Sequence, residues 1–275
     1  MSLSSTELSF INVGDSKYKI AVLALAKSET ANAFNAEMMK EITECLSNVE
    51  TSENVRALVL YGKGKHFSAG ADLGWMKQSA TLTYEQNIDD SHNLTNMFEK
   101  LFNLKIPTVA LVKGAAFGGA VGLAACCDVV LCEKNAKICL SEVRLGLLPA
   151  VIMPYLAKRI LPGQLKRLSL GAQLFKGTDA LIYGLADRIF EGDEANAVLI
   201  EELNHLLVGG PYAQELLKKL HRELHDNSYK QCNETAVAIA TARTSKQGQS
   251  GLSAFFDKAN SPWITSLDKD QKIIG

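Results

Sequence analysis

Thr108-Val-Ala-Leu-Val-Lys-Gly-Ala-Ala-Phe-Gly-Gly-Ala120 is the stretch of sequence that decides the fold class. Its first five residues, Thr108–Val112, are aliphatic or β-branched and predict a buried strand. The apolar residues Val121–Cys127 follow and have the length of a buried helix. The glycines in between allow a sharp bend, because no Cβ intervenes. A strand, a glycine turn and a buried helix in this order indicate an α/β protein.

Buried strands and amphipathic helices are also expected on both sides of this stretch. We expect three further buried strands, at Ile20–Leu25, Ala57–Tyr61 and Val129–Cys132. Asn35 is expected to cap a helix that runs to about Val49 with its apolar residues on one face. A second helix is expected over Ser91–Leu104, ending before Pro107, because the residue before a proline disfavours the helical region.

The character of the chain changes after about Gly192. Helical periodicity with more charge predicts helices at Ala195–Leu207 and Pro211–Leu224. The residues after Trp263 are polar and predict a mobile tail. We therefore expect a core over 1–192, a helical C-terminal region over 193–263 and a tail over 264–275.

Composition narrows the class of protein. The formal net charge of −1 argues against broad electrostatic capture of nucleic acid or of an anionic membrane. No apolar run reaches the ~20 residues of a membrane helix. The six cysteines show neither a CxxC pair nor metal-ligand spacing with the five histidines, so we expect reduced, structural thiols and no metal. The N-terminus lacks signal-peptide features, so we expect a cytoplasmic protein.

A second glycine-containing turn, Gly62-Lys-Gly-Lys-His-Phe-Ser-Ala-Gly-Ala-Asp-Leu73, follows the strand that ends at Tyr61. Neither this turn nor Gly114–Gly119 matches a P-loop or a dinucleotide-binding motif. Two amides at such turns could stabilise an oxygen that gains negative charge during a reaction. From the residues alone, ordinary tight turns are the favoured interpretation.

Five segments resemble motifs of the crotonase (enoyl-CoA hydratase/isomerase) superfamily and occur along the chain in the order that the family has. They are His66-Phe-Ser-Ala-Gly-Ala-Asp-Leu73, Ile106–Ala120 followed by Cys127-Asp128, Ser141-Glu-Val-Arg-Leu-Gly-Leu-Leu-Pro149, Ala31-Asn-Ala-Phe-Asn35 and Gly251-Leu-Ser-Ala-Phe-Phe-Asp-Lys258. One of these alone would be a weak signal, whereas the set covers nearly the whole chain. The resemblance implies a spiral of β-β-α units with a helical C-terminal trimerisation region, and thus an enzyme acting on an acyl-CoA thioester.

The resemblance also implies roles for individual residues. The backbone amides of Ala71 and Gly119 would form an oxyanion hole for the thioester carbonyl. Coenzyme A would be held as part of the substrate, with no separate cofactor, by residues on several segments: Glu29, Ala33, Ala69, Asp72, Leu73, Phe255 and Lys258. The last two would often serve a neighbouring subunit of a homotrimer or of a dimer of trimers.

The acid–base part of the site departs from the family pattern. Hydratases of this family use two glutamates twenty positions apart; Glu142 matches the second, whereas Gly122 stands in place of the first. We expect Glu142 to act as acid and base, with a pKa raised by its apolar pocket. Asp72 is expected to cap the following helix and Asp128 to brace a junction. Asp89 or Asp90, at the start of the second helix, is a less favoured substitute for the missing acid.

The details resemble bacterial methylglutaconyl-CoA hydratases of leucine degradation, and also hydratases of γ-carboxygeranoyl-CoA. Both act on a branched enoyl chain with an extra carboxylate, for which Arg144 is a candidate partner; pairing of Arg144 with Glu142 or another acid is the equal alternative. Gly122 would relieve charge repulsion and make room for a methyl branch, and Trp75 would line the pocket or the core. A decarboxylase or isomerase of a CoA or carrier thioester remains an alternative, and an RNA-binding role is disfavoured by the charge balance.

Overall fold

The computed structural model describes residues 5–79, 81–226 and 231–274. A six-stranded sheet at its centre has the order β1-β2-β3-β4-β6-β9, and only the β1–β2 pair is antiparallel. A smaller sheet has the order β5-β7-β8. The large sheet consists of β1 (Thr6–Asn12), β2 (Lys19–Leu25), β3 (Val55–Gly62), β4 (Thr108–Val112), β6 (Val129–Glu133) and β9 (Arg188–Phe190). The small sheet consists of β5 (Ala115–Phe117), β7 (Lys137–Cys139) and β8 (Phe175–Lys176).

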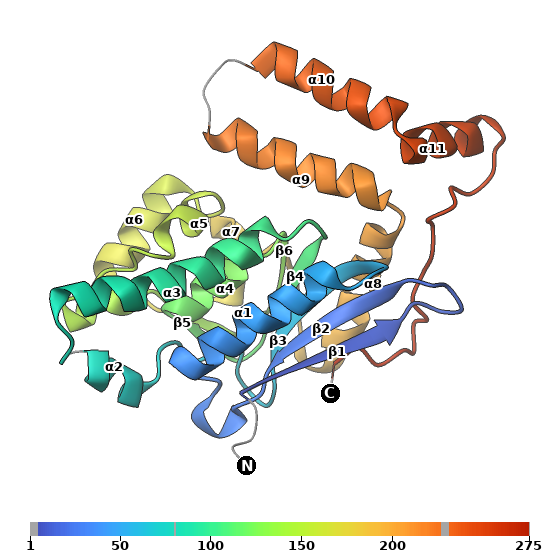
Figure 1. The fold of residues 1–275 in the computed structure, drawn as a ribbon. Helices are drawn as coiled ribbons and strands as arrows, with labels where there is room; N and C mark the ends of the chain where they lie inside the picture. The colour runs from blue at the N-terminus through green and yellow to red at the C-terminus, as the bar shows by residue number, and fades with distance from the viewer. Residues whose placement is uncertain (1–4, 80, 227–230, 275) are drawn as a thin grey trace.

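Helices cover both faces of the large sheet (Figure 1). Successive side chains of a strand point to opposite faces, so β2 and β3 contribute alternate residues to two separate apolar clusters. One cluster also contains α1 (Ala36–Thr51), α3 (Tyr84–Asn103) and α4 (Gly119–Cys126). The other contains α8 (Ala195–Leu207). Burial on both faces explains why these strands are continuous apolar runs.

The predicted strands and helices are confirmed, with shifted ends. Asn35 caps α1, because its side-chain oxygen accepts a hydrogen bond from the backbone N–H of Met38 at 3.0 Å. The second helix begins at Tyr84 rather than Ser91, since Thr83 and Gln86 form a capping box. Strands β1 and β9 and the short strands of the small sheet were not among the predicted elements.

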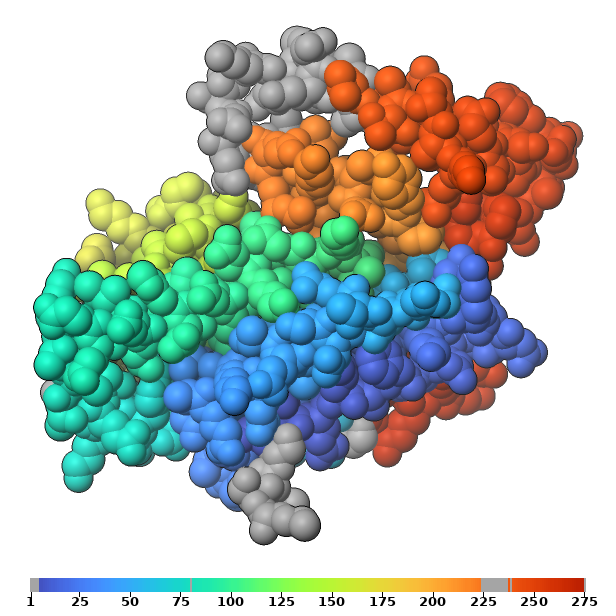
Figure 2. Space-filling model, in the orientation of Figure 1, coloured from blue at the N-terminus to red at the C-terminus, as the bar shows by residue number. Residues whose placement is uncertain are grey.

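The remaining helices are short or lie in the C-terminal region. Those that precede α8 in the chain are η1 (Ser28–Thr30), α2 (Leu73–Ser79), η2 (Glu142–Leu145), α5 (Met153–Ala157), α6 (Pro162–Gly171), α7 (Gly177–Tyr183) and η3 (Gly192–Glu194). Three more, α9 (Pro211–Asp226), α10 (Gln231–Thr244) and α11 (Lys246–Phe256), form a layer at one end of the molecule (Figures 1 and 2). Helix α8 instead packs beneath the sheet, so the core continues beyond the boundary expected at residue 192.

The C-terminal segment that we expected to be mobile packs against the core. Leu267 and Ile273 are each 4% exposed and belong to the same apolar cluster as α8. The side chains of Asn204 and Asn196 accept hydrogen bonds from the backbone N–H groups of these two residues, at 2.6 and 2.9 Å. The prediction failed because the few apolar residues of this segment, among them Leu267, Ile273 and the partly buried Ile274, are sufficient to anchor it.

Most of the cysteines are core residues, as expected. Cys126, Cys127, Cys132 and Cys139 are buried, and burial raises the pKa of the Cys127 and Cys132 thiols to about 12. Such thiols stay protonated and unreactive near neutral pH. Among the described residues, no helix combines the length and apolar character needed to cross a bilayer.

Arg56 connects the sheet to the start of the C-terminal layer. This residue on β3 is 3% exposed and donates hydrogen bonds to the backbone oxygens of Trp263, Leu207 and Gly209, at 2.9, 3.2 and 2.6 Å. We expect Arg56→Met to lower the free energy of unfolding by about 3 kcal/mol, because buried carbonyls lose charged donors. Urea denaturation would measure it.

The matched control for that substitution is Arg188→Met. Arg188 forms ion pairs with Glu201 and Glu202 that are partly exposed to solvent, and such pairs are worth about 0–1 kcal/mol. Equal losses in the two variants would contradict the role that we assign to Arg56.

Candidate active site

The two glycine-containing turns lie side by side. Ser68 and Ala116 form a parallel bridge, in which Ser68 N–H donates to Ala115 at 3.1 Å and Phe117 N–H donates to Ser68 at 3.2 Å. Phe34 brings Ala71 and Gly119 close together, because it forms a bridge with Ala71 and its ring Cζ lies 2.6 Å from where a Cβ on Gly119 would stand. The turns also touch, since a Cβ on Gly70 would stand only 2.4 Å from the Phe117 carbonyl oxygen.

The backbone amides of Ala71 and Gly119 have no hydrogen-bond acceptor among the described residues. On either side of Ala71, the Gly70 carbonyl and the Asp72 amide bond to the backbone of Phe34, at 2.9 and 3.0 Å. The N–H of Ala71 itself therefore points away from Phe34. Gly119 is the first residue of α4, where an N–H has no partner within the helix. Neither amide donates to any acceptor in the described part of the chain.

The carboxyl group of Glu142 lies beside these amides. It comes from η2, and its Oε1 is 3.1 Å from where a Cβ on Gly118 would stand. The other oxygen, Oε2, is buried and has no hydrogen-bond partner among the described residues. Burial raises the pKa of this carboxyl above its ordinary value, as expected for a group that exchanges protons near neutrality. The structure thus brings Ala71, Gly119 and Glu142 together.

Gly122 does not open a pocket. It is buried in α4, and a Cβ at this position would stand 2.2 Å from Cγ2 of Ile152 and 3.1 Å from the ring of Phe98. Ile152 itself is 3% exposed. Our expectation that Gly122 makes room for a methyl branch is therefore wrong, because the Ile152 side chain fills the space.

This packing predicts the outcome of Gly122→Glu. We expect the variant to lose at least 3 kcal/mol of stability and to gain no hydratase activity, because the new carboxyl must enter the space held by Ile152 and Phe98. Thermal unfolding and turnover of crotonyl-CoA would measure both effects. Gly163→Glu is the control, because a Cβ at Gly163 meets nothing within 4 Å. A well-folded Gly122→Glu enzyme with raised turnover would contradict this prediction.

The segment predicted to hold the adenine of coenzyme A adjoins the first turn. Glu29 lies in η1, and Ala33 follows it. Ala69 donates its N–H to the carbonyl of Ala31 at 2.8 Å, so the segments around Ala33 and Ala69 run next to each other. The segment with Glu29 and Ala33 thus lies next to the one that carries Ala69 and Ala71, and binding of the adenine there stays a prediction.

The residues after Ala71 have different surroundings. Asp72 caps α2 as expected, because its Oδ1 accepts a hydrogen bond from the N–H of Trp75 at 2.9 Å. Leu73 is 82% exposed, whereas Trp75 is half-buried and packs on the core. Asp90 and Asp89 lie within α3 rather than at its start, and Asp89 is exposed.

Two predicted CoA-binding residues are not brought to the site within this chain. Phe255 is 75% exposed on α11, and Lys258 follows the end of that helix. In Figure 1, α11 and α2 lie at opposite ends of the molecule.

Arg144 is exposed, two residues after Glu142, and donates a hydrogen bond to the carbonyl of Ala172 at 2.6 Å. Among the side chains that the structure describes, no carboxylate lies within ion-pair distance of Arg144. The alternative that Arg144 pairs with Glu142 is therefore wrong.

Sequence reasoning missed one residue that braces the first turn. Asn32 is fully buried, and its Nδ2 donates to the carbonyls of Lys63 and His66, at 2.9 and 2.8 Å. The backbone carbonyl of Asn32 accepts a hydrogen bond from the Ser68 hydroxyl at 2.7 Å. An asparagine between alanines in an otherwise apolar segment was the available signal, since buried amides are almost always hydrogen-bonded.

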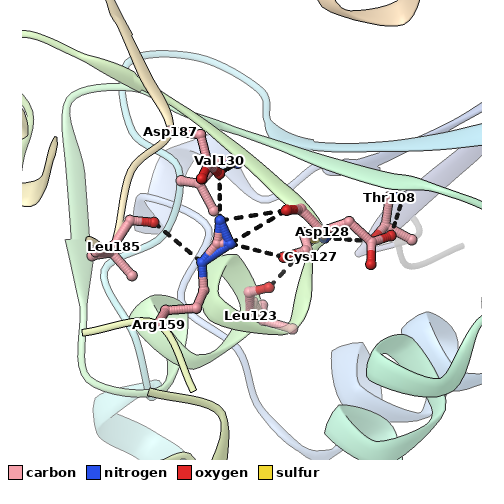
Figure 3. A network of polar contacts seen from close by, with 8 residues as sticks. All are labelled: Thr108, Leu123, Cys127, Asp128, Val130, Arg159, Leu185 and Asp187. Carbon is pink, nitrogen blue, oxygen red and sulfur yellow. Dashed lines mark hydrogen bonds and ion pairs between the residues drawn. The ribbon is translucent and has the colours of Figure 1, made fainter. Parts of the chain in front are cut away.

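A second polar network lies where strands β4 and β6 begin, at the ends opposite to those that lead to the two turns (Figure 3). Asp128 accepts hydrogen bonds from the backbone N–H and the hydroxyl of Thr108 and from Lys218, at 2.8, 2.9 and 2.5 Å. Arg159 pairs with Asp187 and also reaches the Asp128 carbonyl. Asp128 is thus the expected brace. A cavity of about 550 Å³ adjoins this network, between α9 and the core.

Comparison with known proteins decides the family. Residues 15–266 match the family described as enoyl-CoA hydratase/isomerase. This chain belongs to the enoyl-CoA hydratase/isomerase family. The enzyme is similar to an enoyl-CoA hydratase structure from Shewanella pealeana, with 34% identity, a TM-score of 0.89 and coverage of 95% of this chain and 97% of that one.

Two further proteins resemble the enzyme. Pseudomonas aeruginosa AtuE is 30% identical, with a TM-score of 0.88 and coverage of 95% of this chain and 100% of that one. A short-chain-enoyl-CoA hydratase of Clostridium acetobutylicum is 29% identical over 249 residues, which is 87% of this chain and 92% of that protein. The predicted crotonase-like α/β fold and the prediction of an enzyme of this family are confirmed.

Proposed function

We propose that the enzyme adds water to a branched enoyl-CoA that carries a second carboxylate, such as 3-methylglutaconyl-CoA. The observation that carries the hydration step is the meeting of two unpaired amides with the buried carboxyl group of Glu142. In this proposal Ala71 and Gly119 hold the thioester oxygen, on which negative charge develops when the double bond is attacked.

Glu142 handles both protons in this scheme. Its carboxylate takes a proton from water while the hydroxyl oxygen bonds to the β-carbon, and the electrons of the double bond move toward the thioester oxygen. The proton then passes to the α-carbon, and the carbonyl reforms. A single carboxyl group must do both because Ile152 packs over Gly122, where other family members carry a second glutamate.

The surroundings of Arg144 support an acidic substrate. Arg144 is an exposed residue two places after Glu142, uses one guanidinium nitrogen on the Ala172 carbonyl and has no carboxylate partner among the described side chains. The remaining donors are suited to a substrate carboxylate. The likeness of Leu140–Ala150 to methylglutaconyl-CoA hydratases favours the same substrate class, with γ-carboxygeranoyl-CoA as the variant of it.

We further propose that the enzyme works in the cytoplasm as a homotrimer or a dimer of trimers. Phe255 and Lys258 are remote from the site of their own chain, which supports a role at the coenzyme A of a neighbouring subunit. Coenzyme A enters as part of the substrate, and no other cofactor is required.

Turnover of three thioesters would test the proposal. We expect 3-methylglutaconyl-CoA to have a higher kcat/KM than crotonyl-CoA or γ-carboxygeranoyl-CoA, and Arg144→Ala to raise KM for the acidic substrates alone. Release of carbon dioxide without water addition would instead support the decarboxylase alternative, which a single acid also allows. Equal kcat/KM for crotonyl-CoA and 3-methylglutaconyl-CoA would contradict the substrate assignment.

A further inference from the structure

Phe34 contacts the backbone on both sides of the amide pair. It lies between η1 and α1, is 1% exposed and belongs to the main apolar cluster. Its N–H donates to the carbonyl of Gly70, and its own carbonyl accepts from the N–H of Asp72, at 2.9 and 3.0 Å. These two bonds fix the peptide groups on either side of Ala71.

The ring of Phe34 contacts the second turn. A Cβ on Gly119 would stand 2.6 Å from its Cζ and 3.1 Å from its Cε2. Gly119 therefore lies directly against the edge of the ring. Glycine is required there because a side chain would collide with the ring. The backbone conformation does not require it, since φ is not positive at Gly119.

One rigid residue thus links the two halves of the proposed oxyanion hole. The backbone of Phe34 is bonded to the Ala71 segment, and its ring supports Gly119, so the distance between the amides depends on the size and orientation of one side chain. We propose that Phe34 is a positioning residue that sets the separation of the Ala71 and Gly119 amides. This inference rests on the proposed oxyanion function, in which amides must be held near 2.7–3.1 Å from the charged oxygen.

The substitution Phe34→Leu tests this arrangement. It keeps both backbone hydrogen bonds but removes the ring edge from beneath Gly119. We expect kcat to fall about tenfold to a hundredfold, below the loss expected for a whole missing donor. KM should change less than about threefold, because the groups that hold coenzyme A keep their places.

The carbonyl stretch of a bound, 13C-labelled enoyl-CoA thioester reports polarisation directly. In the unmodified enzyme we expect a lower frequency than in solution, and in Phe34→Leu a return toward the solution value. Phe190→Leu is the matched control, because Phe190 is 2% exposed but lies in the cluster beside α8. It should lower Tm without altering the carbonyl frequency or kcat.

A pair of substitutions tests the contact from the other side. In Gly119→Ala the new methyl group collides with the Phe34 ring, so kcat should fall; in Gly119→Ala combined with Phe34→Leu the smaller side chain makes room, and kcat should exceed that of Gly119→Ala alone. Should Phe34→Leu fail to fold, the carbonyl frequency of Gly119→Ala carries the test.

The outcomes separate the two proposals. An unshifted carbonyl frequency in the unmodified enzyme would overturn the oxyanion function itself. A shifted frequency there, with the same frequency and kcat in Phe34→Leu, would leave that function standing and overturn the role of Phe34. A double variant whose kcat does not exceed that of Gly119→Ala would likewise overturn the role of Phe34.

Discussion

Glu142→Gln is expected to reduce kcat for enoyl-CoA hydration by about 10²–10⁴-fold, the contribution typical of a positioned acid–base group. The amide retains the shape of the side chain but can neither accept a proton from water nor return one to carbon. No carboxyl group at position 122 compensates, because this residue is glycine and the Ile152 side chain fills the space beside it. Stopped-flow or steady-state loss of the enoyl-thioester absorbance would measure the effect.

Binding should survive this substitution. The amides of Ala71 and Gly119 are untouched, so the dissociation constant of the thioester should change by less than about threefold. Glu85→Gln is a suitable control, because Glu85 is an exposed residue in the first turn of α3. Turnover by Glu142→Gln within a factor of three of the unmodified enzyme would contradict the assignment.

The same residue predicts a pH dependence. Glu142 must be ionised to take a proton from water, and burial raises its pKa above the ordinary value of 4.5. The activity should therefore rise with pH as Glu142 loses its proton, with a midpoint above the ordinary value of 4.5, and fall at lower pH as the group becomes protonated. A pH profile of kcat/KM would show this rise. If the residual activity of Glu142→Gln showed the same rise, the pH dependence would belong to another group.

Much of the fold could be predicted because the strands are buried on both faces. Such strands read as short apolar runs between glycine and proline residues, and Thr108–Val112 was predicted with its observed ends. The start of α3 was misplaced because its first turns are polar and exposed, so only the Thr83–Gln86 capping box marks it. Periodicity has no signal where a helix does not touch the core.

The site could be predicted only in part. The glycines alone favoured ordinary tight turns, and only the resemblance to the family pointed to Ala71, Gly119 and Glu142, which the structure places near one another. The contacts that shape the site are between residues far apart in sequence: Ile152 over Gly122, and the Phe34 ring under Gly119. No periodicity or local motif tells which side chain will meet a given glycine, because that depends on how the elements pack.

Gly118 is where both halves of the site meet. It has φ 54° and ψ −124°, a combination that is costly for any residue with a side chain. It also precedes Gly119 and lies below the Glu142 carboxyl group, whose Oε1 would be 3.1 Å from a new Cβ. A methyl group at this position would both strain the turn and press on the Glu142 carboxyl group.

Gly118→Ala is therefore expected to reduce kcat by about 10²–10³-fold, as for loss of one oxyanion donor, and to destabilise the fold by about 1–3 kcal/mol. The matched control is Gly192→Ala. Gly192 has φ 50°, close to the 54° of Gly118, but a Cβ there meets nothing within 4 Å. The control should lose stability, because alanine is strained at positive φ, and keep its kcat, because its strain lies away from Glu142 and Gly119. Equal kcat in Gly118→Ala and the unmodified enzyme would mean that the turn can relax without moving either group, and would contradict this geometry.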